Sequence, residues 1–321
     1  MLKQKSADVS SFEHIEQCLV DLEAHKDEWA LLPISEKVEL LHATKSELKV
    51  YAQEWVSASA AGKNLDPQSP WVGEEWVGGP WALAGWINAM VDTLDALEKG
   101  ENPPVKKIRT RSNGQVVAKV FPNNFYDEVL LSGASAEVWM RPEVTLDNLW
   151  EDTAVFYKES HPTGKVSLVL GAGNIMSIAP LDVLYKLYAD GEVVILKMNP
   201  VNDYLGPALE KIFKPFVQRG FIRFAYGGVE VGQFLTDHEK VETLHITGSG
   251  RTHDAIMFGL GEEGAARKAS GTLRLNKPIT SELGGVGPVI VVPGPWSDAD
   301  VAFQAQNIAT MKLQNAGCWI I

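Results

Sequence analysis

One stretch decides the fold: GKVSLVLGAGNIMSIAPLDVLYKLYADGEVVILKMNP, residues 164–200. Its two runs of valine, isoleucine and leucine flank a segment in which apolar residues recur at helical spacing. Buried parallel strands are almost continuously apolar, and the crossover that joins two of them is usually a helix. The stretch therefore predicts a strand, a helix and a second, parallel strand.

The same alternation continues further along the chain. Strand patterns occur at 221–228 and 241–250, and helix patterns at 205–220, 229–239 and 251–261. This order predicts the α/β class, with a Rossmann-like parallel sheet and flanking helices. The polar, glycine-punctuated stretch 261–278 is expected to be an inserted loop, and VGPVIVV (286–292) a further strand.

A helical region precedes the sheet. Ser10 and Glu13 fit a capping box before a first helix, and Ser35 is expected to cap a second. A loop rich in glycine, proline and tryptophan, residues 65–80, leads into a third helix. Beyond it the pattern changes to strands, which predict a protruding sheet used in assembly. These strands are 116–121 and 136–141.

Composition limits the functions that the chain can have. Of 321 residues 45% are hydrophobic, and the net charge of -12 disfavours nonspecific nucleic-acid binding. The two cysteines, Cys18 and Cys318, and seven histidines show neither a disulfide framework nor metal-ligand spacing. Residues 1–17 lack the apolar core of a signal peptide, and no apolar run has membrane-spanning length. We therefore expect a cytoplasmic protein without a metal site, a nucleic-acid partner or a membrane partner.

Ligands on parallel sheets bind at the carboxyl ends of the strands. The one literal G-x-G-x-x-G pattern, 259–264, follows an expected helix, and Glu262 and Glu263 would repel a pyrophosphate, so we interpret it as a surface loop. The pattern at 171–176 follows a strand but lacks the third glycine. The standard dinucleotide signature is thus absent.

Other strand ends carry more suitable residues. Lys197, beside Asn199, can bond ribose hydroxyls or balance phosphate charge, or it can be a solvated strand end. Residues 247–250 (TGSG) place small residues at a helix amino terminus, which suits an anion, although the same residues also suit an ordinary turn. Glu282 precedes paired glycines and is a candidate general base or a solvated carboxylate.

Five segments, taken in order, resemble the aldehyde dehydrogenase superfamily. They are residues 164–180 with Asn174, 189–200 with Lys197, 227–249 with Gly232, Gly248 and Ser249, 281–292 with Glu282, and LQNAGC, 313–318. The resemblance implies NAD or NADP as cofactor. The positions it implies for cofactor binding are Lys197, Asn199, Gly228, Gly232, Gly248, Ser249 and Leu283.

The resemblance also implies a mechanism. A cysteine thiolate, here Cys318, attacks an aldehyde carbonyl, and the amide of Asn174 holds the oxyanion. Hydride passes to the nicotinamide, and Glu282 activates the water that hydrolyses the thioester to a carboxylic acid. Two alternatives remain: an acyl-CoA or acyl-phosphate reductase of the same superfamily, or a catalytically inactive nucleotide-binding or assembly module.

Three departures from the family pattern matter. Cys318 comes two positions early and Ile320 holds the family's cysteine spacing, so either Cys318 is the nucleophile or the thiol is lost. Met198 and Asn199 stand where many members have a serine–glutamate pair. The chain also ends directly after the cysteine motif, so we expect a truncated enzyme that forms a homo-oligomer when full length.

The expected domain layout follows from these assignments. It comprises a nucleotide-binding domain, 1–281, and the beginning of a second α/β catalytic domain, 282–321, truncated. Within the first domain we expect a helical region at 1–104, protruding strands at about 105–150 and an α/β core at 164–281.

Overall fold

The computed structural model describes residues 8–284 and 287–317. The chain divides into two compact units. The larger unit consists of Met1–Leu32, Leu40–Ile87 and Pro162–Ile321, and the smaller unit of Pro33–Glu39 and Asn88–His161. In the described part of the chain, no helix is both long enough and apolar enough to cross a membrane.

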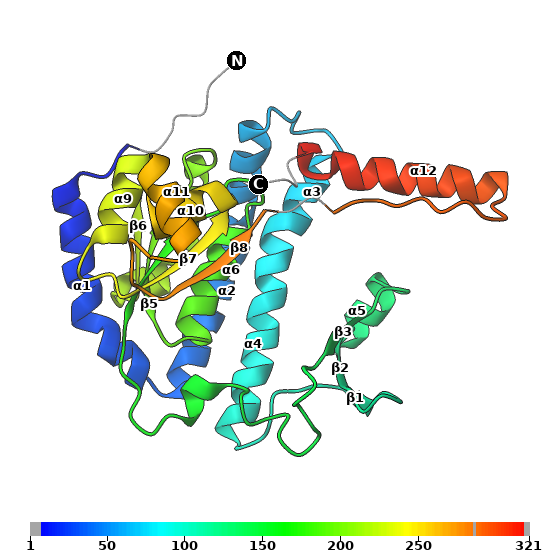
Figure 1. The fold of residues 1–321 in the computed structure, drawn as a ribbon, viewed down its shortest axis with the longest axis horizontal. Coiled ribbons are helices and arrows are strands. Elements are labelled where there is room, and N and C mark those ends of the chain that lie inside the picture. The colour runs from blue at the N-terminus through cyan, green and yellow to red at the C-terminus, as the bar shows by residue number, and fades with distance from the viewer. Residues whose placement is uncertain (1–7, 285–286, 318–321) are drawn as a thin grey trace. The chain divides into compact units, whose positions relative to one another are not determined.

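A five-stranded parallel sheet forms the core of the larger unit, with the strand order β6-β5-β4-β7-β8 (Figure 1). Its strands are β4 (Val166–Leu170), β5 (Val193–Lys197), β6 (Ile222–Ala225), β7 (Thr243–Gly248) and β8 (Ile279–Leu283). Every residue of β5 is buried, as expected for a strand covered on both faces. The predicted fold class, a Rossmann-like α/β sheet with flanking helices, is confirmed.

Helices cover both faces of this sheet. The chain leaves β4 in one direction through β5 and β6, then returns to build β7 and β8 on the other side. Right-handed crossovers therefore place α6, α7 and α8 on one face and α9, α10 and α11 on the other. Their bounds are α6 (Ile178–Tyr188), α7 (Gly206–Ile212), α8 (Lys214–Gln218), α9 (Val229–Asp237), α10 (Gly250–Phe258) and α11 (Gly261–Ser270).

The first helix, α1 (Phe12–Leu31), ties the sheet to both sets of helices. Near its start Phe12 packs on Phe234 of α9, with ring centroids 4.8 Å apart. Near its end Trp29 is fully buried, contacts Tyr188 and Phe221 through its ring, and donates its indole N–H to the carbonyl of Leu187. Burial of an aromatic ring of this size makes Trp29 a major contributor to the core.

The predicted helical amino-terminal region is present, but its caps and its loop differ from the prediction. Ser11, not Ser10, caps α1 by accepting the N–H of His14, while the Ser10 hydroxyl accepts the N–H of Tyr226. Ser35 lies inside α2, and residues 72–80 of the expected loop are helical. Further bounds are α2 (Ile34–Gly62), α3 (Val72–Trp76), the π-helix η1 (Val77–Trp81) and α4 (Ala82–Glu98).

The smaller unit contains an antiparallel sheet with the order β1-β2-β3. Its elements are β1 (Lys107–Thr110), β2 (Val116–Phe121), α5 (Phe125–Leu130), β3 (Ala136–Trp139) and the 3-10 turn η2 (Val155–Lys158). All four residues of β3 are exposed. In the same unit, Lys37 is only 1% exposed and its ammonium lies 4.6 Å from the centroid of the Phe156 ring.

Two predictions about the carboxyl-terminal part are wrong. The expected inserted loop contains α11, whose glutamates near the start and basic residues near the end complement the helix dipole. SEL (281–283) belongs to β8 itself, and described residues 287–292 of the expected strand form no strand. The remaining elements are α12 (Asp298–Leu313), which begins with a capping box at Ser297, and the 3-10 turn η4 (Gln314–Gly317).

Candidate nucleotide-binding site

A cavity of about 590 Å³ opens at the carboxyl ends of the parallel strands, between the sheet and the helices α9 and α10. It lies at β4, where the strand order reverses, which is the general binding position in open α/β sheets. Its lining comes from seven segments. They contribute Leu170 and Gly171; Lys197, Asn199 and Pro200; Gly228, Val229, Gly232, Gln233 and Thr236; Ile246, Thr247, Gly248 and Ser249; Thr252, Ala255 and Ile256; Gly259 and Leu260; and Arg274.

Two helix amino termini open onto this cavity. α9 starts after Gly228, which lacks a side chain that would cover the free backbone N–H groups. α10 starts after Ser249, whose hydroxyl accepts the N–H of Thr252 at 3.1 Å. Unpaired N–H groups and the helix dipole together favour an anion at such a position. A pyrophosphate fits this pair of helix starts by charge.

Lys197 brings a buried positive charge to the cavity. It ends β5, is 8% exposed, and its ammonium makes no hydrogen bond or ion pair with another described residue. Burial lowers the pKa of Lys197 below its ordinary value of 10.5, and the charge of Asp203 in the 3-10 turn η3 (Asp203–Leu205) offsets part of this effect. A ligand with hydroxyl or anionic oxygen atoms would solvate this ammonium.

Asn199 shapes the turn beside Lys197. Its side-chain nitrogen donates to the carbonyl of Gly171 at 3.2 Å, and its side-chain oxygen accepts the N–H of Val201 at 3.0 Å. A Cβ atom on Gly173 would lie 2.8 Å from the Asn199 amide carbon, so the two loops approach closely only because position 173 is glycine. Asn199 thus joins the ends of β4 and β5.

Among the described residues, no aspartate or glutamate lines the cavity, although the whole chain has a net charge of -12. Its second cation, Arg274, lies in the segment between α11 and β8 and donates to the Asp237 carboxylate at 2.9 Å and to the carbonyl of Ile256. Sequence reasoning missed Arg274, together with Thr252, Ile256 and Leu260. A loop over 261–278, as the sequence predicts, gives no reason to place Arg274 at the cavity.

Most of the predicted cofactor positions meet in this cavity. Leu283 does not line it: the side chain is 41% exposed, and its residue pairs with Gly248 across β7 and β8. The positions that do line it are Lys197, Asn199, Gly228, Gly232, Gly248 and Ser249. Four separate strand and helix ends supply these residues, which explains why no compact sequence signature marks them.

The candidate catalytic residues lie outside the cavity lining. Asn174 follows β4, and its side-chain oxygen is buried without a hydrogen-bond partner among the described residues. Glu282 is exposed on β8 and lies opposite Thr247 in the register of β7 and β8. Cys318 lies outside the described residues.

The face of the sheet that carries Glu282 also carries a polar cluster. Side chains of paired residues in parallel strands point to the same face, so Glu282 shares a face with Thr247 and, two residues earlier, His245. The Thr247 hydroxyl donates to Asp182 of α6 at 2.9 Å, and His245 contacts the Thr280 hydroxyl at 2.8 Å. Glu282 therefore lies on the α6 face, whereas the cavity lies on the α9 and α10 face.

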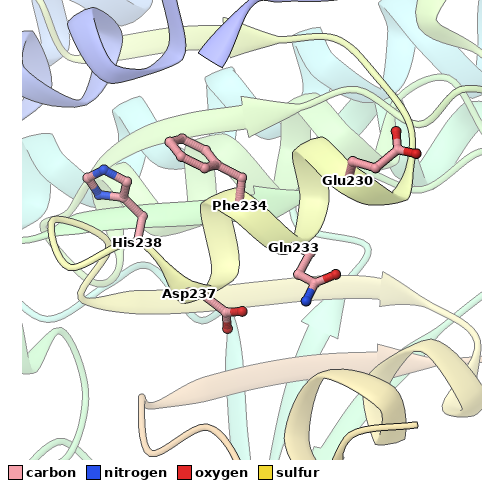
Figure 2. Close-up of a pocket in the computed structure, with 5 residues that line it drawn as sticks. All are labelled: Glu230, Gln233, Phe234, Asp237 and His238. Carbon is pink, nitrogen blue, oxygen red and sulfur yellow. The ribbon is translucent and has the colours of Figure 1, made fainter. Parts of the chain in front are cut away.

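A second depression, of about 410 Å³, lies at α9, and Figure 2 shows its lining residues on that helix and directly after its carboxyl end. Glu230 and Asp237 give it a negative character that disfavours phosphate. Its ring residues already pack against α1: Phe234 contacts Phe12, and His238 contacts Glu16 at 2.7 Å. We interpret this depression as a packing surface between helices.

Comparison with known proteins identifies the family of the chain. The model of the aldehyde dehydrogenase family matches residues 128–319. The chain belongs to the aldehyde dehydrogenase family. The match begins well before residue 164, where the sequence resemblance first became clear.

Two similar proteins illustrate the relationship. The chain is 33% identical over 132 residues to D-glyceraldehyde dehydrogenase (NADP(+)) of Thermoplasma acidophilum, covering 40% of this chain and 23% of that protein. It is 26% identical over 237 residues to the dimeric NADP-preferring aldehyde dehydrogenase of Mus musculus, covering 71% and 48%. The chain therefore spans about half or less of the length of these relatives.

A solved structure supports the fold. The Mycobacterium tuberculosis aldehyde dehydrogenase complexed with NAD+ superposes with a TM-score of 0.53 at 17% identity. The superposition covers 87% of this chain and 45% of that one. At this identity the likeness shows a common fold alone.

Proposed function

We propose that the cavity binds a nicotinamide dinucleotide, NAD or NADP, in an extended pose across the ends of β5 and β7. The observation that carries the proposal is the buried ammonium of Lys197, which has no partner among the described residues and lies in a cavity to which those residues contribute no carboxylate. The two helix starts at Gly228 and Ser249 supply N–H groups for the pyrophosphate. Lys197 donates to the adenosine ribose or its phosphate.

NADP fits the charge of this cavity better than NAD. Sites that select NAD commonly place a carboxylate on the ribose 2′-hydroxyl, and this carboxylate would repel a 2′-phosphate. Asn199 is neutral and the lining contains no acidic residue. We therefore infer that a 2′-phosphate is accepted beside Lys197. Two relatives, the D-glyceraldehyde dehydrogenase and the mouse enzyme, carry NADP in their names.

We further propose that the protein to which this chain belongs oxidises an aldehyde to a carboxylic acid. The bound nicotinamide supplies a hydride acceptor. The thiolate of Cys318 forms a bond to the carbonyl carbon, and the Asn174 amide donates to the resulting oxyanion. After hydride leaves the carbon, Glu282 accepts a proton from the water that displaces the thiolate.

Three features support this assignment. The side chain of Asn315 donates to the backbone carbonyl of Asn174, and Cys318 follows Asn315 by three positions, a length of chain that spans at most about 10 Å. Glu282 is exposed, so water reaches it, which favours hydrolysis over the alternative of a reductase that transfers the acyl group to another acceptor. The match to the family model also extends through residue 319.

Calorimetric titration of the chain with NADPH and NADH tests the cofactor assignment. A Cβ on Gly232 would meet no atom within 4 Å, so Gly232→Leu keeps the fold and places a larger side chain in the cavity. We expect this variant to lose binding. Gly85→Leu is the matched control, because Gly85 also lies inside a helix, α4, with open space around it. Equal affinity in both variants, or no binding by the folded wild-type chain, contradicts the proposal.

A further inference from the structure

A buried charge pair lies in the helical amino-terminal region, far in sequence from the predicted catalytic residues. Glu75 of α3 is 2% exposed. Its two carboxylate oxygens accept hydrogen bonds from the ammonium of Lys63, at 2.7 and 2.9 Å. The hydroxyl of Ser59 on α2 donates to the same carboxylate at 2.5 Å. Lys63 directly follows α2 and Glu75 lies in α3, so the ion pair joins these two helices.

The pair extends to Asn315, in the 3-10 turn η4. The Lys63 ammonium also donates to the side-chain oxygen of Asn315 at 2.5 Å. The backbone N–H of Asn315 donates to the carboxylate of Glu74 at 3.1 Å. Asn315 is 9% exposed and has a positive φ of 51°, a conformation that asparagine tolerates better than most residues.

Asn315 in turn reaches the loop after β4. Its side-chain nitrogen donates to the backbone carbonyl of Asn174 at 3.0 Å. The backbone N–H, side-chain oxygen and side-chain nitrogen of Asn315 are thus each bonded, to segments 241, 252 and 141 residues away along the chain. The side-chain oxygen of Asn174, by contrast, is buried without a partner among the described residues.

We call Lys63, Glu75 and Asn315 the anchor. Two charged groups, Glu75 of the anchor and Asp203, act on Tyr204, and Asp203 also acts on Lys197. Tyr204 packs on Gly62, where no side chain larger than glycine fits beneath its ring. Burial raises the pKa of Tyr204, and the charges of Glu75 and Asp203 raise it further. The charge of Asp203 also acts on Lys197, so the same carboxylate influences the pKa of Tyr204 and of Lys197.

Burying two opposite charges gains little stability, because desolvation offsets most of their attraction, but such a pair fixes the geometry of the groups bonded to it. We propose that Lys63 and Glu75 are positioning residues that hold Asn315 against the backbone of Asn174, and so fix the turn η4 beside the loop that carries the predicted oxyanion-binding amide. The role of this link in catalysis rests on the proposed function. The structural link from Lys63 and Glu75 to Asn315 does not depend on that function.

Amide hydrogen exchange measured by mass spectrometry tests this proposal in the whole chain without requiring activity. The double variant Lys63→Met and Glu75→Gln removes both charges, so that neither is left unpaired. We expect exchange at Asn315 to become about tenfold faster or more, because its turn opens locally. Exchange in β4, β5 and β7 and calorimetric NADPH affinity should stay unchanged. Lys63→Arg, which retains donors and charge, should restore slow exchange at Asn315.

The exposed pair Lys211 and Glu54 provides a matched control. These side chains are 46% and 44% exposed and lie 2.7 Å apart, and the same substitutions there should leave Asn315 exchange unaltered. Unchanged exchange at Asn315 in the Lys63 and Glu75 double variant overturns the proposal. Equal acceleration throughout the sheet also overturns it, since the pair would then support the whole unit. If the wild-type chain does not bind NADPH, the proposed function is refuted, but the hydrogen exchange at Asn315 still tests the link to Lys63 and Glu75.

Discussion

Substituting Lys197 with methionine should weaken NADPH binding without reducing the stability of the free protein. In the free protein the ammonium is buried at 8% exposure, and burial lowers the pKa of Lys197. In the complex the ammonium makes charge-assisted hydrogen bonds, each worth about 1.5–3 kcal/mol. Since about 1.4 kcal/mol corresponds to a factor of ten in affinity, Lys197→Met should raise the Kd for NADPH by roughly 10- to 100-fold.

The same substitution should leave the free protein as stable as before or more stable, because a desolvated charge is replaced by an apolar side chain of similar length. The pH dependence has a definite sign. With the folded pKa lowered, the unfolded chain binds more protons between that pKa and 10.5, so Lys197 makes stability rise with pH in this window. Lys197→Met removes this rise.

Calorimetry with NADPH and thermal unfolding across pH 7–10, both on the same samples, check these two effects, with Lys49→Met as a control at an exposed lysine. An unchanged Kd would show that Lys197 does not contact the ligand. A large fall in Tm in the absence of ligand would show that the ammonium is part of a stabilising contact, which contradicts the reasoning.

Three further perturbations have expected outcomes. Lys37→Met should stabilise the protein by up to about 3 kcal/mol at pH 7, because burial lowers the pKa of Lys37 from 10.5 to about 8. This gain should vanish above the unfolded pKa of 10.5, and urea unfolding at pH 7 and pH 11 measures the difference. Gly164→Ala should cost about 1–3 kcal/mol and lower Tm, because its Cβ would overlap the backbone carbonyl of Lys26, whereas Gly85→Ala has open space. Asn199→Asp should weaken NADPH relative to NADH by about tenfold or more through repulsion of the 2′-phosphate, and an unchanged ratio in calorimetric competition would place that phosphate elsewhere.

The sequence predicted the parallel sheet well, because β4, β5 and β7 are buried on both faces and therefore read as apolar runs. The sequence also predicts that Lys197, Gly248 and Ser249 lie at one site, because ligands on such sheets bind at the strand ends, and all three line the cavity. α11 was missed because its polar composition and glycines resemble a loop, and its helix depends on end charges and a Gly271 cap.

The anchor at Asn315 could not be foreseen for a different reason. Glu74 and Glu75 are two of many acidic residues in the sequence, and only the tertiary fold brings them to a turn about 240 residues away. Arg274 is a similar case: its bond to Asp237 and its place at the cavity depend on how α9, α10 and the segment before β8 pack. Side chains that meet over such distances leave no periodic pattern in the sequence.

A crystal structure of this chain with NADPH tests the central claim most directly. We expect the pyrophosphate at the N–H groups after Gly228 and Ser249, with the adenosine ribose and its 2′-phosphate within hydrogen-bond distance of the Lys197 ammonium. Density for the dinucleotide on the acidic depression of α9, or anywhere that leaves Lys197 without a ligand contact, would contradict it.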